Sequence, residues 1–217
     1  MKNIKSKNCC VIENLNLKSL LLLVIFLAIW IPGCSSSSES DEEEYEAETK
    51  SEVKNKNKAE NSEAEKILKI AEQEQRNVMY SPDVDSTYLY WLDNQIIVLN
   101  GSTKCNIFAL NVLYKSGFKT PNENALSRDL FDTIKFSEIL PVIGINDVSQ
   151  ARKGDIIVWY NHVIIFESQL EIGNELYAIA WWAGTSQDDN GKNIINNVCY
   201  GKYKLNREFI IRRPVKK

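Results

Sequence analysis

The chain has 217 residues, a quarter of them charged, and its 26 basic and 29 acidic side chains leave a net charge of −3. Residues 63–217 alone carry 18 basic and 19 acidic side chains, a net charge of −1 (18 − 19), whereas nucleic-acid-binding proteins present a strongly basic face. With one histidine and no Cys-X-X-Cys pair, the sequence also gives no support for a zinc site. We therefore expect no nucleic-acid partner, no metal and no other cofactor.

Residues 1–33 are predicted to be an export signal. Four lysines (Lys2, Lys5, Lys7 and Lys18) accompany an apolar run from Leu20 to Pro32, which is too short to span a membrane comfortably. The run ends in Ile31-Pro32-Gly33-Cys34, which resembles a bacterial lipobox. That resemblance implies cleavage before Cys34 and attachment of diacylglycerol and a fatty acyl chain such as palmitate. An ordinary signal peptide or an uncleaved anchor is the alternative.

After the lipidated Cys34, residues 35–62 hold nine acidic and four basic side chains and almost no large apolar ones. Such a segment cannot bury enough apolar surface to offset its chain entropy, so residues 34–62 are predicted to be a disordered tether. The acidic run Asp41–Glu44 lacks the glycine of a calcium loop, and we interpret it as solvated. The resulting expectation is a lipid-anchored protein of the bacterial cell envelope, in contact with a bilayer whose leaflet is not determined.

Residues 63–217 are long enough for one domain. A helix is predicted from Glu63 to about Arg76, with Ser62 as N-cap and Glu65 completing a capping box. Two short strands follow, Tyr88–Leu92 and Gln95–Leu99, around a turn at Asp93-Asn94.

A central helix is predicted from about Thr103 to Ser116, capped by Ser102 or Thr103 and ended by Gly117. Cys105 lies at its start, where the helix dipole and unpaired backbone N–H groups favour a thiolate, so we expect its pKa to lie below the ordinary value. A non-catalytic protein could also contain most of this helix, because its apolar face packs into the core.

The remainder contains one more helical stretch around 125–133, an irregular run to Val148, and then strands. The predicted strands are 155–160, 162–167, 176–183, 194–203 and 208–213. Helices followed by short strands with turn residues between them indicate an α+β domain with an antiparallel meander that closes toward a barrel.

Cys105 and Cys199 are the two cysteines of this domain. A disulfide between them is one possibility for an exported protein, and it would silence any thiol chemistry. The alternative is that Cys199, in an alternating strand pattern, acts as a small buried hydrophobe.

Three segments carry a resemblance. The helix start Cys105-Asn106-Ile107-Phe108, the segment Lys153–Trp159 with its Gly-Asp turn, and the strand His162–Glu167 resemble the papain-like cell-wall hydrolases of NlpC and CHAP type. The resemblance covers roughly residues 85–185. It implies a papain-like fold over residues 63–217 (core 85–213), in which N-terminal helices pack on a small antiparallel sheet or half-barrel. It also implies that Cys105 attacks an amide and that His162, 57 residues later (162 − 105), takes its proton.

The family also places a third polar group on the strand that follows the histidine strand. In this chain the central positions of that following strand are apolar or aromatic. Ser186 is the candidate for this role, with Gln187, Glu167 or a backbone carbonyl as alternatives. Trp181, Trp182 and Tyr88, together with Tyr90 and Trp159, are candidates for the wall of a substrate groove, although aromatic strand residues usually fill the core.

The leading hypothesis is a monomeric, membrane-tethered cysteine peptidase or amidase that cleaves amide bonds in peptidoglycan stem peptides. The first rival is a non-catalytic surface lipoprotein that uses the same fold as a binding module. A second rival is a thiol hydrolase or acyl transferase whose substrate is unrelated to peptidoglycan.

Overall fold

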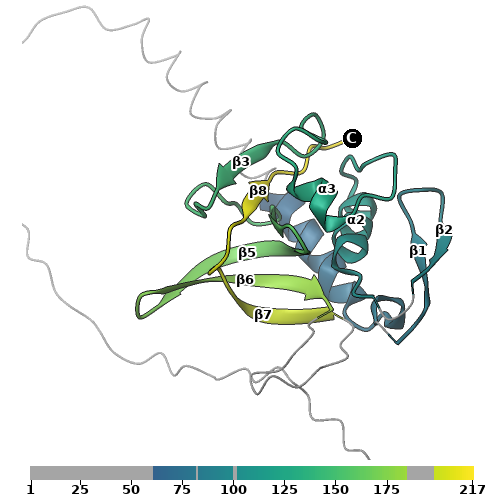
Figure 1. The fold of residues 1–217 in the computed structure, drawn as a ribbon, viewed down its shortest axis with the longest axis horizontal. Helices are drawn as coiled ribbons and strands as arrows, with labels where there is room; N and C mark the ends of the chain where they lie inside the picture. The colour runs from purple at the N-terminus through teal and green to yellow at the C-terminus, as the bar shows by residue number, and fades with distance from the viewer. Residues whose placement is uncertain (1–60, 82, 100–101, 185–197) are drawn as a thin grey trace, which may run out of the picture. The chain divides into compact units, whose positions relative to one another are not determined.

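The computed structural model describes residues 61–81, 83–99, 102–184 and 198–217 (Figure 1). All of them belong to one compact unit, Lys58–Lys217. The predicted export signal, Cys34 and nearly all of the tether lie outside the described residues, as do Ser186 and Gln187. Within the described ranges, no helix is both long and apolar enough to cross a membrane.

The architecture is α+β, as predicted, with a two-stranded and a six-stranded antiparallel sheet. The large sheet has the order β3-β8-β4-β5-β6-β7. Its strands are β3 (Val142–Ile145), β4 (Ile156–Trp159), β5 (His162–Ile172), β6 (Glu175–Ala183), β7 (Val198–Lys204) and β8 (Ile210–Arg212).

The prediction of a simple meander is only partly correct. Strands β4 to β7 follow one another, but β8 returns to pair with β4, and β3 lies beyond β8. β3 falls in the segment that was expected to be irregular, where Gly144 accompanies a register shift. Its partner strand is near the C-terminus, so local sequence carries little information about this pairing.

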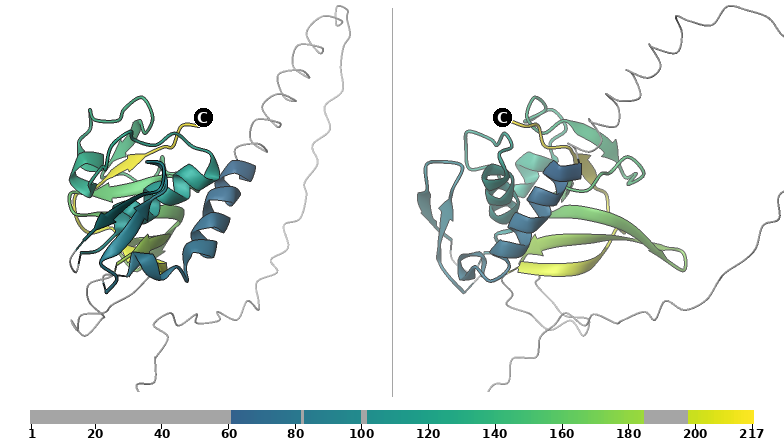
Figure 2. Two further views of the ribbon diagram at one scale, coloured as in Figure 1. Left: turned by 90° about the vertical axis from the view of Figure 1, so that its right-hand side faces the viewer. Right: turned by 180° about the vertical axis from the view of Figure 1, so that it is seen from behind.

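The large sheet has two apolar faces because the side chains of a strand alternate. Ile156, Val158, Val163 and Ile165 face one core cluster together with the helices, and we call this the helix face. Ile157, Trp159, Ile164 and Phe166 face a second cluster on the opposite side, which we call the strand face. Figure 2 shows the first helix lying beside the strands of the large sheet.

The first helix is described over residues 61–74. Its apolar periodicity is confirmed, since Ala64, Ile67, Leu68 and Ala71 are all buried. Ser62 is already helical, so the predicted N-cap at Ser62 is wrong.

The central helix is α2 (Cys105–Ser116), which begins two residues later than predicted. Its N-cap is Lys104, whose side chain makes no capping bond, so Ser102 and Thr103 do not cap the helix. The buried Lys104 ammonium instead donates to the carbonyls of Met79 (2.7 Å), Ser81 (3.1 Å) and Val84. These bonds fix the start of the helix.

The end of α2 is as predicted, because Gly117 adopts φ +91° in the left-handed region that favours glycine. A short helix α3 (Ser127–Phe131) confirms the second helical stretch, and its Asp129 carboxylate accepts from the Leu126 N–H at 2.9 Å. A 3-10 turn η1 (Val78–Tyr80) precedes the small sheet.

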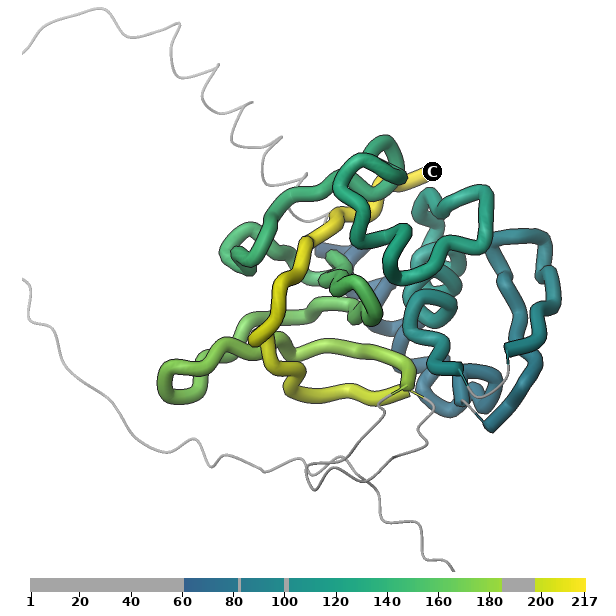
Figure 3. Tube along the Cα trace, viewed as in Figure 1, coloured from purple at the N-terminus to yellow at the C-terminus, as the bar shows by residue number. Residues whose placement is uncertain are grey.

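The small sheet is the hairpin β1 (Ser86–Leu89) and β2 (Gln95–Val98), beside α2 in Figure 3. Asp93 and Asn94 both have positive φ, which confirms the predicted turn. Asn111 of α2 ties the hairpin to the helix, because it accepts from the Tyr90 N–H at 2.8 Å and donates to the Tyr88 carbonyl at 3.0 Å.

The Gly-Asp turn before β4 has a structural role. Gly154 has φ +88°, and a Cβ there would lie 2.9 Å from the Ile67 side chain. The buried Asp155 carboxylate accepts from the Arg152 N–H (2.7 Å) and pairs with Arg213 (2.9 Å). The motif therefore holds the first helix against the sheet and leads into the strand before His162.

Candidate active site

The Cys105 sulfur lies at the first residue of α2 and is covered, since the residue is only 2 % exposed. Four groups that can donate to it surround the sulfur. The Ser127 hydroxyl is 3.6 Å away, where either group can be the donor, and hydrogen bonding from the backbone N–H groups of Val163, Asn106 and Cys105 itself lowers the pKa of the thiol. The helix start and the beginning of β5 together form a cradle of donors, which stabilises negative charge.

Burial nevertheless raises the pKa of the Cys105 thiol, and the four donors only reduce that rise. The expectation of a pKa below the ordinary value is therefore wrong for this conformation. The backbone N–H groups act on the sulfur as predicted, but the loss of water around it has the larger effect. At neutral pH the group is a protonated thiol.

His162 is the first residue of β5 and pairs with Trp159 of β4. Its ring stacks on Tyr203 (centroids 5.1 Å apart, planes 19° apart), and the Trp159 ring lies 6.1 Å away. Burial, followed by the positive charge of Arg207, lowers the pKa of His162 to about 4. At neutral pH the imidazole is neutral, which is the state a general base requires.

The thiol and the imidazole reach the same end of β5 by different routes. Val163, which donates its N–H to the sulfur, belongs to the helix face, so the neighbouring His162 side chain turns toward the strand face. The buried His162 Nε2 has no hydrogen-bond partner, and no hydrogen bond joins it to Cys105 within the described residues. Tyr203 stacks on His162; burial raises the pKa of Tyr203, the charge of Arg207 lowers it, and charge on Cys105 raises it.

The third catalytic position stays open. Burial, followed by a hydrogen bond to the Glu167 carboxylate, raises the pKa of Tyr200 to about 12, so Glu167 is engaged by the Tyr200 hydroxyl. Among the described residues no contact joins Glu167 to the imidazole, and the predicted Ser186, like Gln187, lies outside that part of the chain. Orientation of His162 in this structure comes instead from ring contacts.

The aromatic residues proposed for a groove are not brought together. Trp181 and Trp182 are each 8 % exposed and lie on opposite faces of β6. Tyr88 is 42 % exposed and belongs to the separate hairpin, where it stacks on Tyr90. The two tryptophans contribute to the two cores, and Tyr88 is the member of this set with a substantial exposed surface.

Cys105 and Cys199 are both buried and neither forms a disulfide. Their side chains belong to the helix face and the strand face respectively. The possibility that a disulfide silences Cys105 is therefore not realised here. Among the described residues no cluster of His, Cys, Asp and Glu side chains could hold a metal ion.

A hollow of about 310 Å³ lies elsewhere, against the first helix. Its lining includes Ile67, Gly154, Asp155 and Arg213, but neither Cys105 nor His162. The cations that line it are engaged, for example Arg213 with Asp155 and Lys153 with Glu65. This hollow is separate from the candidate site.

Three residues near the site were missed by reasoning from sequence: Ser127, Tyr203 and Arg207. Ser127 follows a loop after Pro121, and nothing local predicts that α3 returns to the start of α2. The sequence identifies Tyr203 only as an aromatic residue in a predicted strand. Its contact with His162 depends on the order of β5, β6 and β7, which sequence spacing does not fix.

Comparison with known proteins adds no relative: the chain matches no protein-family model, no curated protein and no solved structure.

Proposed function

We propose that this protein is a thiol hydrolase of papain-like architecture that cleaves amide bonds, with peptidoglycan stem peptides as the substrate class. The observation that carries the proposal is the cradle around the Cys105 sulfur. Cys105 lies at a helix start, has four groups around it that can donate, and bonds to the backbone of the residue beside the only histidine of the chain. A cysteine that only fills the core does not require these features.

The reaction starts from a neutral pair. His162 takes the thiol proton as the sulfur attacks the substrate carbonyl, so an S–C bond forms and the carbonyl oxygen becomes an oxyanion. Backbone N–H groups at the start of α2, which point at the sulfur in the free protein, are placed to stabilise this charge. The C–N bond then breaks, His162 protonates the leaving amine, and water hydrolyses the thioester.

This mechanism requires the covered sulfur to become accessible. Cys105 is 2 % exposed and His162 is 8 % exposed, so substrate binding must turn both side chains toward a shared space at the end of β5. The position of His162 at the first residue of its strand supports such a turn, because the neighbouring Asn161 and Tyr160 are exposed turn residues rather than core.

The test is product release by the purified full-length protein. Incubation with peptidoglycan fragments or stem peptides is expected to produce new amino termini, detected by amine labelling and mass spectrometry. Cys105→Ala and His162→Ala should each abolish release, while Cys199→Ala serves as the matched control for loss of a buried thiol and should retain it. Release that is equal in wild type and Cys105→Ala would contradict the proposal.

The burial of both groups favours one rival, a binding module that keeps the fold without the chemistry. A thiol with a raised pKa and an imidazole with no hydrogen bond to it are what such a protein would show. If the wild type binds wall fragments yet releases nothing above the Cys105→Ala background from pH 5 to 9, the binding module replaces the hydrolase.

Membrane tethering through Cys34 is part of the proposal and is tested separately. Cys34→Ser should abolish incorporation of labelled palmitate and leave an uncleaved precursor. Normal processing and unchanged membrane partition of that variant would show that Cys34 is not the lipid acceptor.

A further inference from the structure

An aromatic cluster surrounds His162 on the strand face, formed by Trp159, His162, Tyr203 and Phe209. The Trp159 ring contacts the other three, with centroids 5.0 Å from Tyr203, 6.0 Å from Phe209 and 6.1 Å from His162, and Tyr203 stacks on His162 at 5.1 Å. Two polar ring atoms of this cluster, Trp159 Nε1 and His162 Nε2, are buried without a hydrogen-bond partner in the part of the chain that the structure describes. Unsatisfied donors and acceptors in a buried cluster call for an explanation.

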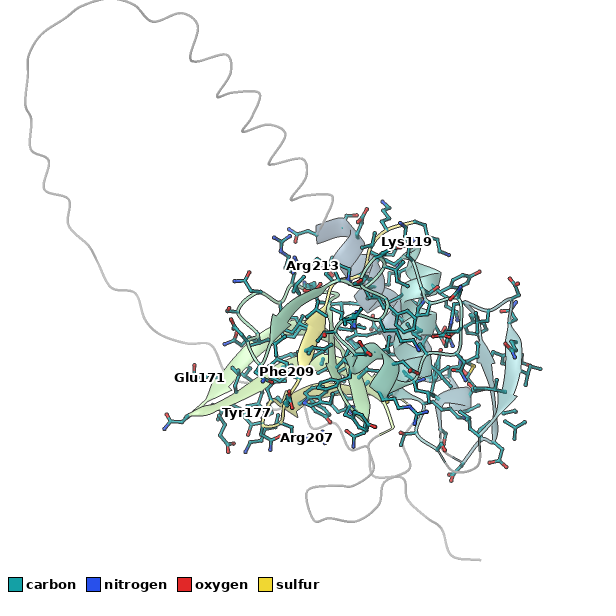
Figure 4. The ribbon with its side chains drawn as sticks, turned by 45° about the horizontal axis from the view of Figure 1, so that its top comes forward. Lys119, Glu171, Tyr177, Arg207, Phe209 and Arg213 are labelled. Atoms are coloured by element: carbon teal, nitrogen blue, oxygen red, sulfur yellow. The ribbon has the colours of Figure 1, made fainter. Side chains whose placement is uncertain are left out.

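Arg207 covers this cluster from the solvent side. Its guanidinium carbon lies 5.9 Å from the Trp159 ring centre, and its Nη2 donates to the Tyr203 hydroxyl at 3.2 Å. The residue is exposed, and no ion pair joins it to any residue in the described part of the chain. It lies at the periphery of the molecule, near Phe209, in Figure 4.

We propose that Arg207 binds a carboxylate group of the substrate and holds it against the aromatic cluster beside His162. A guanidinium presents its N–H groups in a planar fork that matches a carboxylate, and ring contacts hold the fork in place. The hydrogen bond to Tyr203 uses one of these donors and leaves others for a ligand.

The position of Arg207 specifies where the carboxylate lies in the substrate. Tyr203 and Trp159 both lie between Arg207 and His162, because each of these rings contacts both residues. A carboxylate on Arg207 is therefore close to the imidazole. The substrate class that fits is an amide with a free carboxylate near the bond that is cleaved. This inference rests on the proposed function for its link to catalysis, but binding itself does not.

Binding is measured by NMR, because the single histidine gives one unambiguous imidazole signal. The probes are N-acetyl-L-alanine, its uncharged amide and inorganic phosphate, added to full-length protein with labelled histidine. We expect saturable shifts of the His162 signal with N-acetyl-L-alanine, and at least about tenfold weaker binding of the amide, since a hydrogen bond to a charged group typically contributes that much.

Arg207→Gln should weaken binding of the carboxylate probe about tenfold or more and leave binding of the amide unchanged. Arg207→Lys should lie between wild type and Arg207→Gln, because it keeps the charge but not the fork. Lys119→Gln is the matched control for loss of one exposed positive charge, since Lys119 lies on the opposite side of the molecule in Figure 4, and it should bind like wild type.

Equal affinity for N-acetyl-L-alanine in wild type and Arg207→Gln would overturn the proposal, as would the absence of saturable binding to the wild type. Phosphate that binds as tightly as the carboxylate probe would overturn the assignment to carboxylates. The experiment needs no turnover. A protein that binds the carboxylate through Arg207 but cleaves nothing would therefore remove the hydrolase proposal and keep this one.

Discussion

The thiol of Cys105 and the imidazole of His162 are both buried, but their polar surroundings are opposite. Four groups that can donate surround the sulfur, whereas the imidazole is held by rings and its buried Nε2 has no hydrogen-bond partner among the described residues. The helix side of the site is thus prepared for a negative charge, and the strand side keeps a neutral base. Burial raises the pKa of Cys105 and lowers the pKa of His162, and both shifts disfavour a thiolate–imidazolium pair. The charged pair must therefore form when substrate arrives rather than in the free protein.

The largest effect expected from this comparison is on turnover. Cys105→Ala and His162→Ala should each lower the rate of amide cleavage to background. The double variant should be scarcely slower than either single variant, because the two groups act as one unit. The check is the rate of amine release for all four proteins, with far-UV circular dichroism to show that each is folded. Additive losses would mean that the two residues work independently.

His162 should also give the fold a characteristic pH dependence. Its pKa falls from the ordinary 6.5 to about 4 on folding, so the neutral ring favours the folded state above pH 6.5 and this contribution is lost as the pH falls from 6.5 to 4. The shift corresponds to about 3 kcal/mol.

The measurement is the free energy of unfolding in urea at pH 4 to 8 for wild type and His162→Gln. Their difference isolates this residue from carboxylates that titrate in the same range. A constant difference across the pH range would show that His162 is not held in a neutral state by burial.

Thiol reactivity tests the other side of the comparison. In the folded protein, iodoacetamide should label Cys105 slowly at pH 7, with a pH midpoint above the ordinary value of about 8.5, because burial raises its pKa. A substrate peptide should accelerate the labelling of Cys105 before saturating occupancy blocks it, and labelling of Cys199 should not change. Fast labelling of Cys105 at pH 6 in the free protein would contradict the covered, protonated state.

Ser127 carries a smaller effect. Ser127→Ala removes one of four donors, so the pKa of Cys105 should rise further and turnover should fall about tenfold, as expected for loss of a hydrogen bond to a charged group. Ser127→Thr keeps the hydroxyl and should recover part of the rate. The readout is the pH profile of kcat/KM, whose midpoint a purely structural role of Ser127 would not move.

The smallest effect is expected at Glu167. Because Glu167 is engaged by Tyr200, Glu167→Gln should change the rate by less than a factor of about three, in the range of an exposed or peripheral polar contact. A loss that approaches that of His162→Ala would identify Glu167 as the group that orients the imidazole.

Local patterns in the sequence predicted the elements well. The apolar periodicity of residues 64–71, the Asp93-Asn94 turn and the glycine after α2 depend on neighbours in the chain and are confirmed. The α2 start was misplaced because its anchor is the buried Lys104 ammonium, which binds carbonyls more than 19 residues away. The return of β8 to β4 and the approach of Ser127 to the thiol are likewise long-range contacts.

In the candidate site, too, local features were predicted and long-range contacts were not. Cys105 and His162 were identified from residue type, order and position at the start of an element, and these positions are as expected. The direction of the Cys105 pKa was wrong because burial depends on packing by α3 and β5, which sequence spacing does not reveal. Arg207 carries no local signal, because its role depends on which rings fold beneath it.

The central claim is that the Cys105 sulfur forms a covalent bond to the acyl part of an amide substrate. Intact-protein mass spectrometry after rapid acid quench, with an excess of a stem peptide, tests this directly. The account predicts a mass increase equal to the acyl fragment without its amine, located on Cys105, absent in Cys105→Ala and retained in Cys199→Ala. Release of amine from wild type with no adduct on Cys105 at any quench time, together with unchanged release from Cys105→Ala, would contradict it.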